Sequence, residues 1–116
     1  MRIVDRIFGW LMVLAALLHC MGTLTAHLGE DVTLWSLGAG LGELLLAAIN
    51  LMRVGRPADR ALAWVSFAGC LGWLVVIAGF AHLIHSFVDF RVVIQGVITL
   101  VLAVMSARGA LRTSAA

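Results

Sequence analysis

The sequence predicts an all-α membrane protein in which one domain, residues 1–116, forms an antiparallel bundle of four transmembrane helices. The composition is 63% hydrophobic and 12% charged, whereas soluble domains are about half apolar and about a quarter charged. Four apolar segments approach or exceed the length of about 20 residues that crosses the hydrocarbon core. The links between them are short, so neighbouring segments run antiparallel.

Each segment is bounded by polar residues. The four predicted helices cover residues 7–28, 34–52, 61–87 and 92–107. The third is long enough to tilt or to project beyond the lipid, and the fourth is near the short limit. The link between the second and third contains Pro57 and Asp59. We expect a polar turn there, with the Asp59 carboxylate capping the start of the third helix.

The arginines predict an orientation in the membrane. Seven of the eight basic residues lie on the side of the two termini, namely Arg2, Arg6, Arg53, Arg56, Arg60, Arg108 and Arg112. Only Arg91 lies on the other side. This asymmetry places both termini in the cytoplasm, and the composition favours a bacterial inner membrane. A net charge of +2 without a clustered basic face excludes a nucleic-acid partner.

The first and third segments resemble one another. Gly9–His19 reads GWLMVLAALLH and Gly72–His82 reads GWLVVIAGFAH, with six of eleven positions identical. This similarity is expected if a helical hairpin was duplicated in parallel, although apolar segments also match by chance. A duplication makes His19 and His82 symmetry mates.

Every predicted helix has one face of small or polar residues. These faces comprise Met12, Ala15, Ala16, His19, Thr23 and Ala26; Ala39, Glu43, Ala47 and Asn50; Ala68, Gly72, Gly79 and Ser86; and Gln95, Thr99, Leu102 and Ser106. Polar side chains within lipid face other helices. We therefore expect a bundle closed around a polar interior.

Glycines on these helices predict close helix packing. Gly38 and Gly42 have the GxxxG spacing that lets another helix approach closely, and Gly72 and Gly79 lie on the small-residue strip of the third segment. The spacing is common in membrane helices, so it does not name the partner. The predicted partners are the lipid bilayer and either further copies of the chain or other membrane subunits.

Two histidines are candidates for binding a cofactor. Facing imidazoles on two helices of a bundle can hold haem b, and His19 and His82 are the candidate pair. Their depths differ by roughly one helical turn. The alternative is a histidine that bonds to a neighbouring helix, for example to Thr99 or Glu43.

A second group of residues resembles a metal site. His82, His85 and Asp89 lie at spacings of three and four, and His27 reaches the same membrane face. Imidazole with carboxylate suits a divalent metal such as zinc, copper or nickel, and histidines there also suit a pH sensor. The alternative is a solvated helix end whose histidines stay in water.

Glu43 is the acidic residue nearest the middle of a predicted helix. A carboxyl group at that depth is costly and indicates function. It predicts a small proton-coupled transporter that uses Glu43 for proton coupling. The alternatives are a neutral Glu43, or one paired with His19, that only holds the bundle together.

No nucleophile triad, phosphate-binding loop or Cys-rich motif is present, which disfavours catalysis by the chain itself. Three function classes follow. The first is an accessory or structural subunit or homo-oligomer, the second a haem or metal redox module, and the third the transporter.

Overall fold

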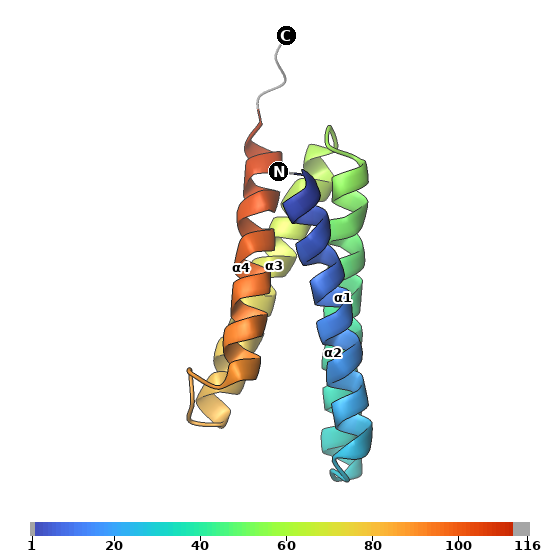
Figure 1. The fold of residues 1–116 in the computed structure, drawn as a ribbon, viewed down its shortest axis with the longest axis vertical. Coiled ribbons are helices and arrows are strands. Elements are labelled where there is room, and N and C mark those ends of the chain that lie inside the picture. The colour runs from blue at the N-terminus through green and yellow to red at the C-terminus, as the bar shows by residue number, and fades with distance from the viewer. Residues whose placement is uncertain (1, 113–116) are drawn as a thin grey trace.

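A computed structural model describes residues 2–112. It contains the helices α1 (Arg2–Thr25), α2 (Glu30–Gly55), α3 (Arg60–Leu83) and α4 (Phe90–Leu111), and no strand within the described residues (Figure 1). All four helices are long and apolar enough to cross a membrane. The predicted all-α, four-helix membrane bundle is thereby confirmed.

The helix ends differ from the apolar segments in a regular way. α1 and α2 continue into polar residues, because a helix need not end where the hydrocarbon does. Two helices end earlier than predicted: α1 ends at Thr25, three residues before the predicted end, and α3 ends at Leu83, four residues before it. His85 follows with φ of 55°, in the left-handed region that commonly ends a helix. His27 has φ of 49° after α1, so the two hairpins turn through similar residues.

Aspartates begin the two helices of the second half. The Asp59 carboxylate accepts a hydrogen bond from the Leu62 amide at 2.9 Å, which confirms the predicted cap of α3. Asp89 accepts in the same way from the Arg91 amide at 3.0 Å, at the start of α4. Both carboxylates satisfy amides that have no partner within the first helical turn.

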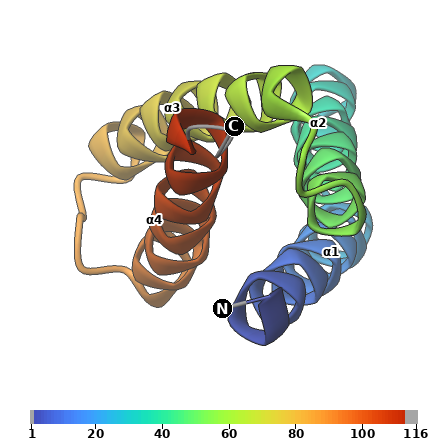
Figure 2. The same cartoon turned by 90° about the horizontal axis from the view of Figure 1, so that it is seen from above.

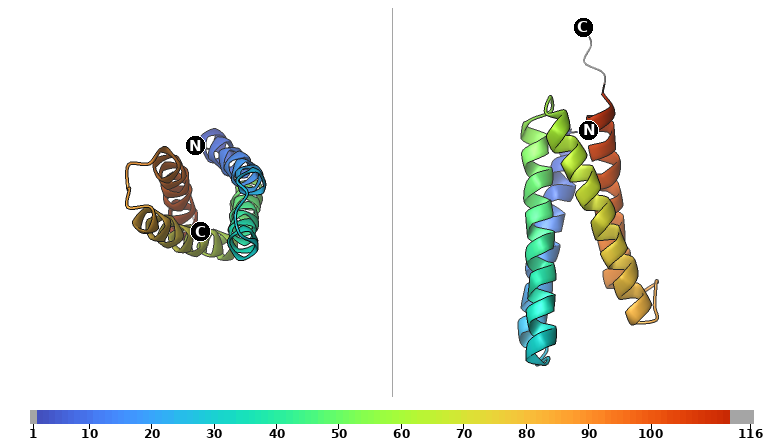
Figure 3. Two further views of the ribbon diagram at one scale, coloured as in Figure 1. Left: turned by 90° about the horizontal axis from the view of Figure 1, so that it is seen from below. Right: turned by 180° about the vertical axis from the view of Figure 1, so that it is seen from behind.

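The helices form two hairpins that meet at one end and diverge at the other (Figures 1 and 3). α1 packs along α2, and α3 packs along α4. α2 also contacts α3 and α4, and α1 contacts α4, whereas the backbones of α1 and α3 do not approach one another within the described chain. We call the end with the α2–α3 turn, the start of α1 and the end of α4 the closed end. The end with turns 26–29 and 84–89 is the open end. Seen from above, the four helices follow an arc (Figure 2).

The core lies between the hairpins. Met12, Leu46, Cys70 and Leu102 pack together from the four helices. Of the predicted inward faces, those of α1, α2 and α4 supply buried residues, but α3 buries Ala63, Ser66, Cys70 and Ala81 in place of its predicted strip. α3 is apolar almost all round, so its sequence does not mark one stripe. The bundle is also closed at one end only.

Candidate functional site

A buried polar network holds the closed end together. The Ser66 hydroxyl donates to Asn50 Oδ1 at 2.8 Å, and the hydroxyl oxygens of Ser66 and Ser106 lie 2.8 Å apart. Asn50 Nδ2 donates to the Leu46 carbonyl at 3.0 Å. All three polar side chains are 0% exposed. Their bonds therefore join α2, α3 and α4 within the apolar core, where an unpaired polar group would be costly.

An ion pair attaches α1 to this network. Arg53 Nη1 donates to Asp5 Oδ2 at 2.9 Å, and Nη2 donates to the other carboxylate oxygen. The two side chains are only 6% and 12% exposed. Arg53 also reaches Asn50 Oδ1 at 3.4 Å and the Met105 carbonyl at 3.5 Å. The network consequently includes all four helices.

The pairing of Asp5 with Arg53 was not predicted from the sequence. Arg53 was counted only among the arginines that predict the orientation. A signal was present, because Arg53 follows Asn50 by three residues and so shares its helix face. Asp5 likewise precedes Met12 by seven residues, on the same side of α1. Nothing local, however, indicates that residues 48 apart in the chain meet.

Glu43 is buried in the middle of α2 without a partner. It is 1% exposed, and neither carboxylate oxygen has a hydrogen-bond partner in the described chain. The Gln95 side chain of α4 faces the carboxyl group, yet Gln95 Oε1 is also unpartnered. Trp73 of α3 is a third residue with a buried atom, Nε1, that has no partner there, and its ring packs beside Gly42. Three helices thus bring unsatisfied polar atoms to mid-depth.

His19 bonds within its own hairpin. Its Nε2 lies 3.0 Å from the Ser36 carbonyl oxygen and 3.1 Å from the Ser36 hydroxyl. The Thr23 hydroxyl is 2.7 Å from the same Ser36 hydroxyl. His82 is exposed on α3, whose backbone α1 does not approach within the described chain. The structure therefore does not bring His19 and His82 together in one chain, and haem b binding stays a prediction.

The residues of the predicted metal site lie apart at the open end. The rings of His82 and His85 have centroids 6.2 Å apart, while His27 follows α1 in the other hairpin. Asp89 pairs with Arg91 at 2.9 Å, and hydrogen bonds from Arg91 hold the pKa of the Asp89 carboxyl below its ordinary value. No group of three metal-ligating side chains occurs within residues 2–112. Divalent-metal binding stays a prediction.

The glycines chosen from the sequence have few neighbours in this chain. A Cβ built on Gly38, Gly72 or Gly79 would meet nothing within 4 Å, and one on Gly42 would meet only Trp73, at 3.9 Å. The close approaches occur elsewhere. A Cβ would crowd Leu51 at Gly9, Cys20 at Gly40 and Leu46 at Gly69. Any role of Gly38, Gly42, Gly72 and Gly79 in helix packing therefore depends on contacts with molecules outside the chain.

Comparisons with protein-family models, curated proteins and solved structures found no match.

Proposed function

We propose that this chain is a multi-pass protein of a bacterial inner membrane, with both termini in the cytoplasm, that acts as a structural subunit by assembling with copies of itself. The arginine asymmetry supports the orientation, since Arg91 is the only basic residue near the open end. One observation supports the proposed self-assembly, namely that Gly38, Gly72 and Gly79 face open space.

Such surfaces are suited to helix association in lipid. Lipid tails are as apolar as leucine, so helices associate through close packing at small residues rather than through the hydrophobic effect. Gly38 lies on α2 and Gly72 on α3, so each hairpin presents one uncovered small-residue face. The hairpins also diverge at the open end (Figure 3). Two copies offer one another matching faces, which is the requirement of a closed symmetric dimer.

The oligomeric state tests this proposal. We expect the wild type to be a dimer or larger oligomer in lipid nanodiscs, and Gly38→Leu or Gly72→Leu to shift it towards the monomer. Gly22→Leu is the matched control, because Gly22 also meets nothing within 4 Å but lies on α1. A wild type that stays monomeric at high protein-to-lipid ratio contradicts the proposal.

Glu43 supports a second candidate function, proton-coupled transport. A buried carboxyl without a counter-charge is expensive inside a membrane. A bound proton removes the charge, and the resulting O–H donates to an acceptor such as the unpartnered Gln95 Oε1.

Proton flux into proteoliposomes tests this candidate. With a potassium diffusion potential and a trapped pH dye, we expect flux in the wild type and its loss in Glu43→Gln. Glu30→Gln is the control, because Glu30 is an exposed acid at the start of the same helix. Equal flux in the wild type and Glu43→Gln contradicts a coupling role.

A further inference from the structure

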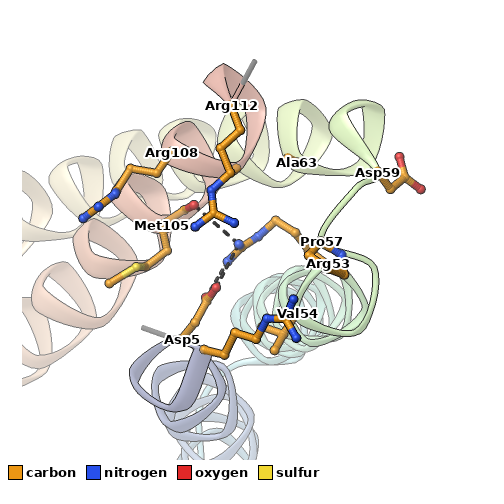
Figure 4. Close-up of a pocket in the computed structure, with 11 residues that line it drawn as sticks. Asp5, Arg53, Val54, Pro57, Asp59, Ala63, Met105, Arg108 and Arg112 are labelled. Atoms are coloured by element: carbon orange, nitrogen blue, oxygen red, sulfur yellow. Dashed lines mark hydrogen bonds and ion pairs between the residues drawn. The ribbon is translucent and has the colours of Figure 1, made fainter. Parts of the chain in front are cut away.

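A cavity of about 50 Å³ lies at the closed end, between the ends of all four helices (Figure 4). By the space that a single water needs, it has room for roughly three or four water-sized groups. Its lining consists of Arg2, Asp5, Arg53, Val54, Pro57, Asp59, Ala63, Met105, Arg108, Gly109 and Arg112. The cavity is therefore small, polar and built by residues from both hairpins.

The charges of the lining are unbalanced. The lining contains four arginines but only two aspartates, and both aspartates are already engaged. Asp5 pairs with Arg53, and Asp59 accepts from the Leu62 amide. Arg108 and Arg112 form no ion pair among the described residues. The cavity thus has an excess of positive charge that the described chain does not compensate.

Arg53 is a fixed part of the cavity wall. The residue is 6% exposed, and Asp5 holds both of its terminal nitrogens. Its Nε–H has no partner in the described chain, although the atom is buried. α4 comes close at this point, since a Cβ on Gly109 would lie 3.9 Å from Arg53 Nη1. An unpaired buried N–H of a charged group is a costly arrangement.

Arg112 approaches from the opposite wall. Figure 4 shows its guanidinium group turned towards that of Arg53, whereas the Arg108 side chain of α4 extends away from this pair. Two guanidinium groups repel one another unless an anion lies between them. Guanidinium groups match the oxygens of phosphate in geometry and in charge.

We propose that this cavity binds a phosphate group, and that an anionic lipid supplies it. The cavity lies where the four helices end, which is the depth of the lipid headgroups on that side of the bilayer. Basic pockets between transmembrane helices are known to recognise anionic headgroups there. This inference does not depend on the oligomer or on the proton coupling of Glu43.

Native mass spectrometry of the detergent-solubilised protein tests the site. We expect phosphatidylglycerol to bind more tightly than phosphatidylcholine, whose choline would place a positive charge beside the arginines. The double variant Arg108→Gln/Arg112→Gln should lose roughly fivefold in affinity for each arginine removed. Arg53 is left intact, because it is needed for the packing of the closed end.

Arg56→Gln is the matched control, since Arg56 lies in the α2–α3 turn at the closed end but does not line the cavity. It should bind phosphatidylglycerol as the wild type does, and circular dichroism should show equal helix content in all variants. Inorganic phosphate is titrated in parallel. If the double variant loses binding of phosphatidylglycerol but not of phosphate, the result supports a lipid site. If it loses binding of phosphate but not of phosphatidylglycerol, the result supports a phosphate site filled from solution. Equal binding by wild type and double variant, for both probes, overturns the proposal.

Discussion

The closed and open ends of the molecule use polar residues differently. At the closed end, Asp5, Arg53, Asn50 and Ser66 bond across helices and connect the two hairpins. At the open end, the bonds stay within one hairpin, as between His19 and Ser36. Apolar contacts alone give helices little reason to prefer one another over lipid. The difference therefore indicates that satisfied polar contacts, rather than hydrophobicity, decide where the hairpins join.

In the second hairpin, too, the polar contacts at the open end stay within the hairpin. The guanidinium carbon of Arg91 lies 5.4 Å from the centroid of the Phe80 ring, a cation–π contact between α4 and α3. Arg91 also bonds to Asp89 in the adjacent turn. Neither contact reaches the first hairpin. We consequently expect each hairpin to be locally stable and the hairpins to move about the closed end.

The largest effect is expected from breaking the ion pair of the closed end. Asp5→Asn leaves the Arg53 charge buried without a counter-charge and should lower the free energy of unfolding by about 3–5 kcal/mol. Unfolding in mixed micelles, followed by circular dichroism, measures this change.

A double variant distinguishes the lost charge pair from lost packing. Asp5→Leu/Arg53→Met removes both charges and keeps apolar volume, so it should be more stable than Asp5→Asn. If Asp5→Asn unfolds like the wild type, the ion pair does not hold α1 to the rest of the bundle.

The second prediction contrasts two buried polar residues of α2. Asn50→Leu removes the acceptor that Ser66 and Arg53 share, and should destabilise the protein by about 1–3 kcal/mol. Glu43→Leu removes two buried oxygens that have no partner in the described part of the chain, so it should leave the stability unchanged or increase it.

The same unfolding measurement compares the two variants. If the two variants change the free energy of unfolding in opposite directions, the network at the closed end differs from Glu43 in whether its polar atoms are hydrogen-bonded, and not in polarity itself. A marked loss of stability in Glu43→Leu would mean that the carboxyl has a partner outside the chain, such as a second copy.

The sequence predicted the fold well because length and apolar composition act locally. It also predicted the buried faces of α2 and α4, where Asn50 and Ser106 stand out from apolar surroundings. It did not predict the partner of Asp5, because an ion pair between residues 48 apart depends on how the hairpins cross. The burial of Ser66, in a helix without one clear apolar stripe, was missed for a related reason.

The third prediction compares two glycines of α2. Gly40→Ala would crowd Cys20 and place a Cβ 3.3 Å from His19 Cδ2. Overpacking costs about 1–3 kcal/mol, and the better helix propensity of alanine offsets at most about 1 kcal/mol. We expect a net loss of stability in Gly40→Ala.

Gly38→Ala is its control in the same helix, because a Cβ there meets nothing within 4 Å. It should be neutral or slightly stabilising in a monomer, since only the propensity changes. A loss of stability in Gly38→Ala that depends on protein concentration would instead indicate a contact between copies. Equal stability of Gly40→Ala and the wild type would show that α1 and α2 separate easily.

The smallest expected effect is a pH dependence at the open end. Arg91 lowers the pKa of Asp89 in the folded protein, so Asp89 stabilises the fold at pH values above its unfolded pKa, about 3.9. That stabilisation is lost as the pH falls through the lower, folded pKa. Hydrogen exchange of the first turn of α4 measures it, because the Asp89 carboxylate accepts from the Arg91 amide. Asp89→Asn should remove the pH dependence.

The location of this effect tests the comparison of the two ends. Asp89 and Arg91 contact only their own hairpin in the described chain, so acidification through the Asp89 titration should loosen the start of α4 without changing exchange in α1 and α2. The Arg91→Gln variant should raise the pKa of Asp89 and move the loss of protection to higher pH. If exchange in α1 also follows the Asp89 titration, the hairpins are coupled at the open end as well as through the closed end and the core.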